Sequence, residues 1–94
     1  MLSKMPIDLS KVGREDLDKE ILRVGLIAEL DAINLYEQMA NMAGNENVRK
    51  ILLDIAREEK THVGEFLALL LKLDSEAVKE LEKGKEEIEE LTEK

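Results

Sequence analysis

The chain has 94 residues, of which 14 are basic and 22 acidic, and its formal net charge is −8 at pH 7. An acidic balance without any basic cluster argues against nucleic acid or an anionic membrane as a partner. Cysteine is absent, which excludes disulfides, iron–sulfur clusters and zinc–thiolate sites. No signal peptide or transmembrane span is recognisable, so the expected compartment is the cytoplasm.

Hydrophobic residues make up 44% of the chain, but Tyr36 and Phe66 are its only aromatic residues. Glycine is sparse, and no run of alternating β-branched residues is present, so an all-α fold is expected. Residues 1–13 lack helical periodicity and include the only proline, and we expect them to form an N-terminal arm. Residues 14–94 contain neither a linker nor an internal repeat, which predicts one helical domain.

The first predicted helix begins near Arg14 and ends at residue 42 or 43. Acidic residues in its first turns suit the positive end of the helix dipole. Gly44 follows, and it is the expected left-handed residue that ends the helix. Apolar positions cover most of the circumference of this helix, so it is expected to pack against more than one neighbour.

The second helix is expected over residues 46–73, with Asn45 as its N-cap. Only two or three residues connect it to the first helix, so the two must fold back as an antiparallel hairpin. A third, shorter helix is expected over residues 76–91, with Asp74 or Ser75 as its cap. Its apolar residues are spaced for one narrow face.

A hairpin and one short helix leave a wide apolar surface uncovered. The residues that need a partner are Ile21, Leu26, Ile27, Leu30, Leu52, Ile55, Phe66, Leu69 and Leu70. The simplest partner is a second copy of the chain, which would complete a four-helix bundle from two hairpins. The pattern therefore predicts a dimer.

An acid and the only histidine interrupt the apolar stripe of the second helix. Residues spaced by three and four from position 48 to position 73 are apolar except Glu59 and His62. The two lie one turn apart on the same face. Burying a polar group without a hydrogen bond costs about 2–7 kcal/mol, and burying an unpaired carboxylate costs more. A carboxylate in such a stripe therefore needs a partner.

Glu29 occupies the equivalent inward position on the first helix. Two hairpins would then bring together two single Glu residues and two Glu-x-x-His pairs, which is the ligand set of the di-iron and di-manganese carboxylate bundles. Carboxylate and imidazole ligands without thiolates favour Fe or Mn. The expected centre is a pair of metal ions shared across the dimer, with Glu29, Glu59 and His62 as ligands that are also catalytic.

Two further residues on the first helix are candidates for supporting roles. Tyr36 lies seven residues after Glu29 on the same face, where it could donate a hydrogen bond to a ligand or simply fill the core. Asp31 is either an acid that guides metal ions to the site or a surface residue that is solvated or forms a salt bridge.

The stretches 28–36 (AELDAINLY) and 58–62 (EEKTH) resemble the encapsulated ferritins, a half-length branch of the ferritin-like superfamily that includes rubrerythrins. The resemblance covers roughly residues 15–91. It implies a di-iron ferroxidase centre at a dimer interface, with Glu29, Glu59 and His62 at the ligand positions. It also implies a ring-shaped decamer of five dimers, and iron oxidation as cargo inside an encapsulin shell.

The sequence departs from the family at two positions near this centre. Asp31 matches an acid of the family's outer metal site, but another acid of that site falls on Ala28, and a family tryptophan falls on Leu35. The sequence ends at Lys94 without an obvious shell-targeting tail. We therefore expect either a cargo protein whose tail has been removed or a fragment of a longer fusion protein.

Two other functions are compatible with the same residues. One is a rubrerythrin-like peroxidase that uses the same pair of irons with hydrogen peroxide as the oxidant. The other is a helical assembly or cargo module without enzymatic activity, in which Glu59 and His62 merely pair across the interface.

Overall fold

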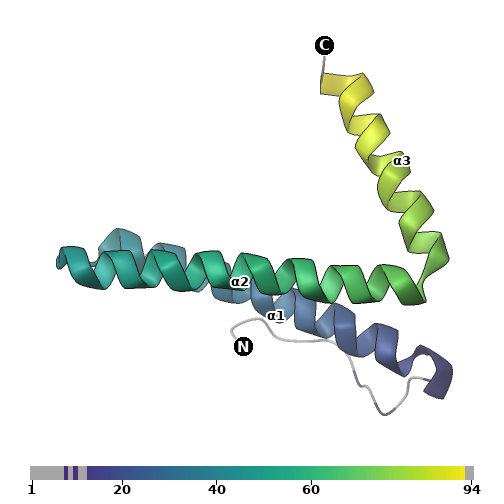
Figure 1. Ribbon diagram of the computed structural model, residues 1–94, viewed down its shortest axis with the longest axis horizontal. Coiled ribbons are helices and arrows are strands. Elements are labelled where there is room, and N and C mark those ends of the chain that lie inside the picture. The colour runs from purple at the N-terminus through teal and green to yellow at the C-terminus, as the bar shows by residue number, and fades with distance from the viewer. Residues whose placement is uncertain (1–7, 9, 11–12, 93–94) are drawn as a thin grey trace.

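The computed structural model describes residues 8, 10 and 13–92, and within them the chain is entirely helical. Helix α1 spans Arg14–Met42, α2 spans Glu46–Leu73 and α3 spans Ser75–Thr92. Helices α1 and α2 lie side by side as an antiparallel hairpin, and α3 leaves the end of α2 at a steep angle (Figure 1). The all-α fold with a helical hairpin and a short C-terminal helix is therefore confirmed.

The predicted element bounds agree closely with the structure. Helix α3 begins and ends one residue outside the predicted range. The arm expected over residues 1–13 falls mostly outside the described part of the chain. No described helix has a stretch that is both long and apolar enough to cross a membrane.

Two polar side chains at the start of α2 define the turn of the hairpin. Asn45 accepts a hydrogen bond from the Val48 N–H at 3.0 Å, so it is the N-cap of α2 as predicted. Arg49 donates from Nη2 to the carbonyl oxygen of Ala43 at 3.0 Å. Because the last turn of α1 contains no basic residue, Arg49 supplies the cation that suits the negative end of this helix.

The expectation of a left-handed Gly44 was wrong. No described residue has a positive φ, and α1 ends instead at Ala43 in an extended conformation, with φ −69° and ψ 131°. The Ala43 N–H still donates to the carbonyl oxygens of Met39 (3.0 Å) and Ala40 (3.3 Å). Arg49 satisfies the Ala43 carbonyl oxygen at the end of the helix. With these contacts made, the turn does not require a left-handed residue.

The hairpin buries only small stretches of each helix. Ile33 and Ala40 are buried on α1, and Ala56 and Leu70 on α2. At Gly25 a Cβ atom would lie 3.1 Å from the ring of Phe66, so the missing side chain lets this ring lie directly against α1. The interface between α1 and α2 is therefore thin and relies on close approach of the two backbones.

Much of the apolar surface that was expected to need a partner is exposed. Of the nine residues, Ile21, Ile27, Leu30 and Leu69 are exposed, and Leu26, Leu52, Ile55 and Phe66 are half-buried. Leu70 was assigned wrongly, because it is only 6% exposed and is already buried within one chain. The radius of gyration is 16.6 Å, against about 12 Å for a compact chain of this length. Within the described part of the chain, one copy therefore encloses only a small core.

We predict that Asn45→Ala destabilises the protein by about 1 kcal/mol, because the Val48 N–H loses its partner. Urea unfolding followed by circular dichroism measures this change. The matched control is Asn47→Ala, two residues further along α2, where the exposed side chain caps nothing. Equal stability of the two variants would contradict the capping role.

Candidate metal centre

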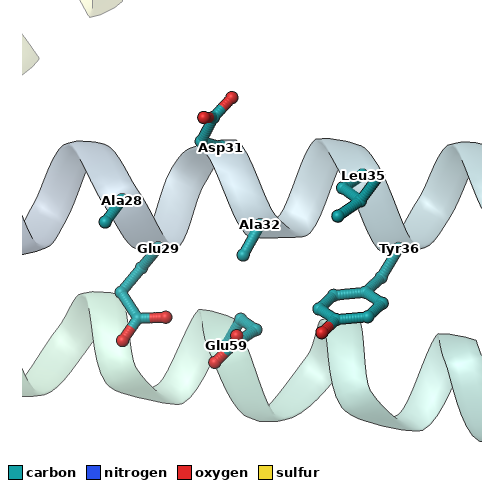
Figure 2. A pocket seen from close by; sticks show the side chains of 7 residues that line it. All are labelled: Ala28, Glu29, Asp31, Ala32, Leu35, Tyr36 and Glu59. Atoms are coloured by element: carbon teal, nitrogen blue, oxygen red, sulfur yellow. The ribbon is translucent and has the colours of Figure 1, made fainter. Parts of the chain in front are cut away.

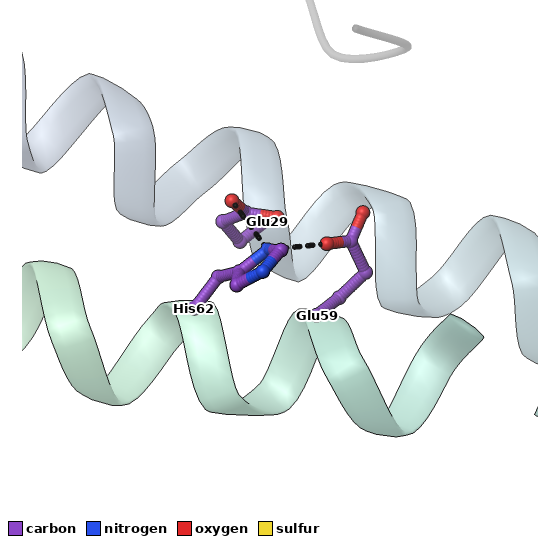
Figure 3. A group of neighbouring side chains, drawn as sticks. All are labelled: Glu29, Glu59 and His62. Carbon is purple, nitrogen blue, oxygen red and sulfur yellow. Dashed lines mark ion pairs between the residues drawn. The ribbon is translucent and has the colours of Figure 1, made fainter. Parts of the chain in front are cut away.

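The candidate site lies at the middle of the hairpin and draws on both long helices. Glu29 projects from α1, and Glu59 and His62 project from adjacent turns of α2, so that the three side chains converge (Figure 3). The spacing of three residues places Glu59 and His62 side by side. The antiparallel fold then brings the centre of α1 opposite them, because the connecting turn is short.

The imidazole of His62 lies between the two carboxylates. Its Nδ1 atom is 2.7 Å from Oε1 of Glu59 and 3.3 Å from Oε2 of Glu29. One ligand atom from each of the three residues lies within 4.8 Å of the others. The side chains of Glu29 and Glu59 are 18% and 19% exposed, whereas that of His62 is 46% exposed. The cluster is thus accessible from one side of the hairpin.

The electrostatics of the cluster favour positive charge. Burial raises the pKa of Glu29, and the neighbouring carboxylate of Glu59 raises it further through a shared hydrogen bond and charge repulsion. For His62, burial acts to lower the pKa, but the hydrogen bond to Glu59 and the charges of both carboxylates outweigh it, so the pKa lies above its ordinary value. The two carboxylates therefore stabilise a cation placed between them.

The chemistry of the donor set suits a transition-metal ion. Carboxylate oxygen and imidazole nitrogen are donors that Fe and Mn accept, and no thiolate is available to select a softer ion. One chain offers three such residues, which leaves coordination positions open for further ligands. Among the described residues no other group of this kind was found.

A cavity of about 480 Å³ opens beside the cluster on the α1 side. Figure 2 shows Glu29, Glu59 and the ring of Tyr36 directed into the space between the two helices, whereas Asp31 projects from the opposite side of α1. The lining residues are Ala28, Glu29, Asp31, Ala32, Leu35, Tyr36 and Glu59. Tyr36 and Asp31 thus lie at the same cavity as two of the three cluster residues but outside the cluster itself.

Sequence reasoning overlooked that small side chains create this cavity. Ala28 and Ala32 follow the spacing of one helix face, and neither fills the space beside Glu29. Two alanines four residues apart next to an inward carboxylate were the available signal. Glu58, adjacent to Glu59 in the sequence, is exposed and takes no part in the cluster.

Comparison with known proteins places the chain in a family. The sequence profile of the rubrerythrin family matches residues 20–93, so the chain belongs to this family of ferritin-like domains. The resemblance to encapsulated ferritins seen in the sequence is confirmed by a solved structure. The crystal structure of the encapsulated ferritin domain from Pyrococcus furiosus matches with a TM-score of 0.84 and 62% identity, and covers 98% of this chain and 96% of that chain.

Longer proteins also match the chain. A ferritin-like–encapsulin shell fusion protein from Pyrococcus furiosus is 73% identical over 73 residues, which are 78% of this chain and 21% of that protein. The encapsulin nanocompartment cargo protein EncC from Myxococcus xanthus is 39% identical over 71% of this chain and 54% of its own length. The chain therefore spans between about a fifth and a half of these relatives.

We predict that Glu29→Gln leaves the metal-free protein at least as stable as the wild type at neutral pH. The raised pKa of Glu29 means that its charged form is disfavoured in the folded state, so this group lowers stability above its folded pKa and ceases to do so as the pH falls through that value. Thermal unfolding in a chelator, at neutral and acidic pH, measures the effect. A clearly lower unfolding temperature of the variant at neutral pH would instead make Glu29 a structural partner of His62.

Proposed function

We propose that the chain is a ferroxidase, which oxidises Fe(II) to Fe(III) with O2 at a centre formed by Glu29, Glu59 and His62. The observation that carries this proposal is the convergence of these three side chains, with ligand atoms within 4.8 Å of one another, on the thin seam of a hairpin. Membership in the rubrerythrin family supports it, because the profile covers all three residues.

The centre is proposed to be shared by two copies of the chain. Three donors from each copy give two single glutamates and two Glu-x-x-His pairs, the ligand set of the carboxylate-bridged two-iron bundles. His62 is the most exposed member of the cluster, so it faces the side from which a second hairpin would approach. Exposed apolar residues on the same helices, such as Ile21 and Leu69, supply surface for that second hairpin to cover.

The residues of this chain would bind and orient the iron. Carboxylates of Glu29 and Glu59 provide negative charge for two Fe(II) ions, and His62 must release its proton before a ring nitrogen can bind a metal. Two neighbouring Fe(II) ions would each supply one electron to one O2 molecule, giving two Fe(III) ions and oxygen reduced to the peroxide level, so that no superoxide would be released. The helical hairpin holds the donors on rigid elements, so that little reorganisation accompanies binding.

Tyr36 and Asp31 are proposed to support this centre from the adjoining cavity. Tyr36 lines the same cavity as Glu29 and Glu59, and we propose that its hydroxyl would donate a hydrogen bond to a ligand carboxylate and so orient it. Asp31 adds negative charge to the outer side of the same cavity, where it would attract Fe(II) arriving from solvent.

The setting of this activity is proposed from the relatives. One of them is named as a fusion to an encapsulin shell, and EncC and EncB are named as encapsulin cargo proteins. We propose that this chain likewise works inside an encapsulin nanocompartment in the cytoplasm, where oxidised iron is stored. A ring-shaped decamer of five dimers is the assembly implied by its resemblance to encapsulated ferritins.

A rubrerythrin-like peroxidase is the second candidate, because the family profile is that of rubrerythrin. It would use the same three residues and the same two irons. The oxidant separates the two functions: a ferroxidase consumes Fe(II) rapidly with O2, whereas the peroxidase reacts faster with hydrogen peroxide.

We predict that Glu59→Ala and His62→Ala each lower the initial rate of Fe(II) oxidation by more than about tenfold. Removing even an outer partner of a metal ligand costs about 10–100-fold, and these residues are the proposed ligands. The rate is measured as Fe(III) absorbance under O2. Glu58→Ala is the matched control, because Glu58 is exposed outside the cluster, and it should keep the wild-type rate. Wild-type rates in all three variants would contradict the proposed ferroxidase centre and favour the assembly module without enzymatic activity.

A further inference from the structure

The corner between α2 and α3 consists of a single residue, Asp74. Its backbone has φ −136° and ψ 89°, which turns the chain sharply out of α2. Apart from this corner, α3 contacts only the end of α2 and does not pack against α1 in the described structure. The direction of α3 therefore depends on whatever holds Asp74 in this conformation.

Asp74 is held from the side of α3 by capping contacts. Its Oδ1 atom accepts a hydrogen bond from the Ala77 N–H at 3.0 Å, and its carbonyl oxygen accepts one from the Val78 N–H at 3.3 Å. Asp74 is thus the N-cap of α3, one of the two caps expected from the sequence. The hydrogen bond from Ala77 is also the main reason why the pKa of Asp74 lies below its usual range, so the side chain is charged at neutral pH.

The other oxygen of the same carboxylate connects the corner to α1. Oδ2 of Asp74 lies 3.2 Å from Nη2 of Arg23, whose Nη1 lies 2.7 Å from Oε2 of Glu20. The Asp74 side chain is only 15% exposed, whereas that of Arg23 is 44% exposed, so the ion pair is shielded from solvent on the carboxylate side only. Asp74 therefore joins all three helices. The residue follows the end of α2, and its carboxylate caps α3 and binds Arg23 on α1.

We propose that the ion pair of Arg23 with Asp74 fixes the direction in which α3 leaves the hairpin, and thereby determines how copies of the chain fit together. This inference rests on the proposed self-association. Arg23 and Asp74 are positioning residues and lie outside the candidate metal centre.

The surface that this corner directs outward is the apolar stripe of α3, defined as Val78, Leu81, Ile88 and Leu91. All four residues are exposed, and Leu91 is 82% exposed. The hairpin of the same chain does not cover the stripe, because α3 points away from it (Figure 1). A second copy is the occupant that the chain itself offers, since its hairpin also exposes apolar residues such as Ile27 and Leu30. A change in the direction of α3 would misalign these surfaces.

The direction of α3 is measured within one chain by the distance between two spin labels. The chain contains no cysteine, so Asn34→Cys on α1 and Glu86→Cys on α3, both exposed positions, provide unique attachment sites. Labelled protein is diluted with unlabelled protein to isolate the distance within one chain. Asp74→Asn keeps a good N-cap residue but removes the charge, and Arg23→Gln removes the partner.

The proposal predicts a broadened or shifted distance distribution in both variants. Arg57→Gln is the control, because its 3.0 Å ion pair with Asp54 lies wholly within α2. Native mass spectrometry of the same proteins should show that the single wild-type assembly size is lost, while pairs of chains remain and keep the wild-type amount of iron per chain, because the proposed centre lies between the two hairpins of one pair. An unchanged distance distribution would contradict the proposal that the ion pair of Arg23 with Asp74 fixes the direction of α3. A broadened distribution with the wild-type assembly size would contradict a role of this ion pair in assembly. Failure of the wild type to bind iron contradicts the ferroxidase and leaves the spin-label result intact.

Discussion

The structure depends on one electrostatic requirement at the centre of the hairpin. Glu29 and Glu59 bring two carboxylates together at a seam where their side chains are only 18% and 19% exposed, and the pKa of Glu29 is raised as a result. Two carboxylates held this close favour a cation between them. Among the described residues, the cation that contacts both carboxylates is the protonated form of His62, whose pKa is raised by the same two groups. A metal ion would place more positive charge between the carboxylates, and its binding would release the proton from His62.

The exposed apolar surface also favours a partner, over a larger area than the metal centre. Among the described residues, four apolar side chains are buried, whereas residues such as Leu30, Leu69 and Ile88 are exposed to solvent. Exposed apolar side chains of this kind are typical of an interaction site. One chain offers three donor residues and, among the described residues, buries few apolar side chains. Pairing of two hairpins would enlarge both the donor set and the core at once, which ties assembly to metal binding.

The sequence predicted the parts of the fold that local rules determine. Periodicity and capping residues located all three helices, and Asn45 and Asp74 act as caps as expected. Glu29, Glu59 and His62 could be grouped because a short turn forces the two helices together. The turn itself was mispredicted at Gly44. A side chain from the next helix, Arg49, binds the carbonyl oxygen of Ala43 at the end of α1, so the turn needs no left-handed residue. The link between Arg23 and Asp74 spans 51 positions, a separation at which no periodicity carries information.

The central claim is that two chains share one metal centre, and native mass spectrometry after anaerobic loading with Fe(II) tests it most directly. This measurement reports the number of chains and the number of bound ions in the same particle. The account predicts an even number of chains that carries about one iron per chain, as a two-metal site between two copies requires. A particle of any size without iron would contradict the account, and Glu29, Glu59 and His62 would then be polar groups of a purely structural hairpin.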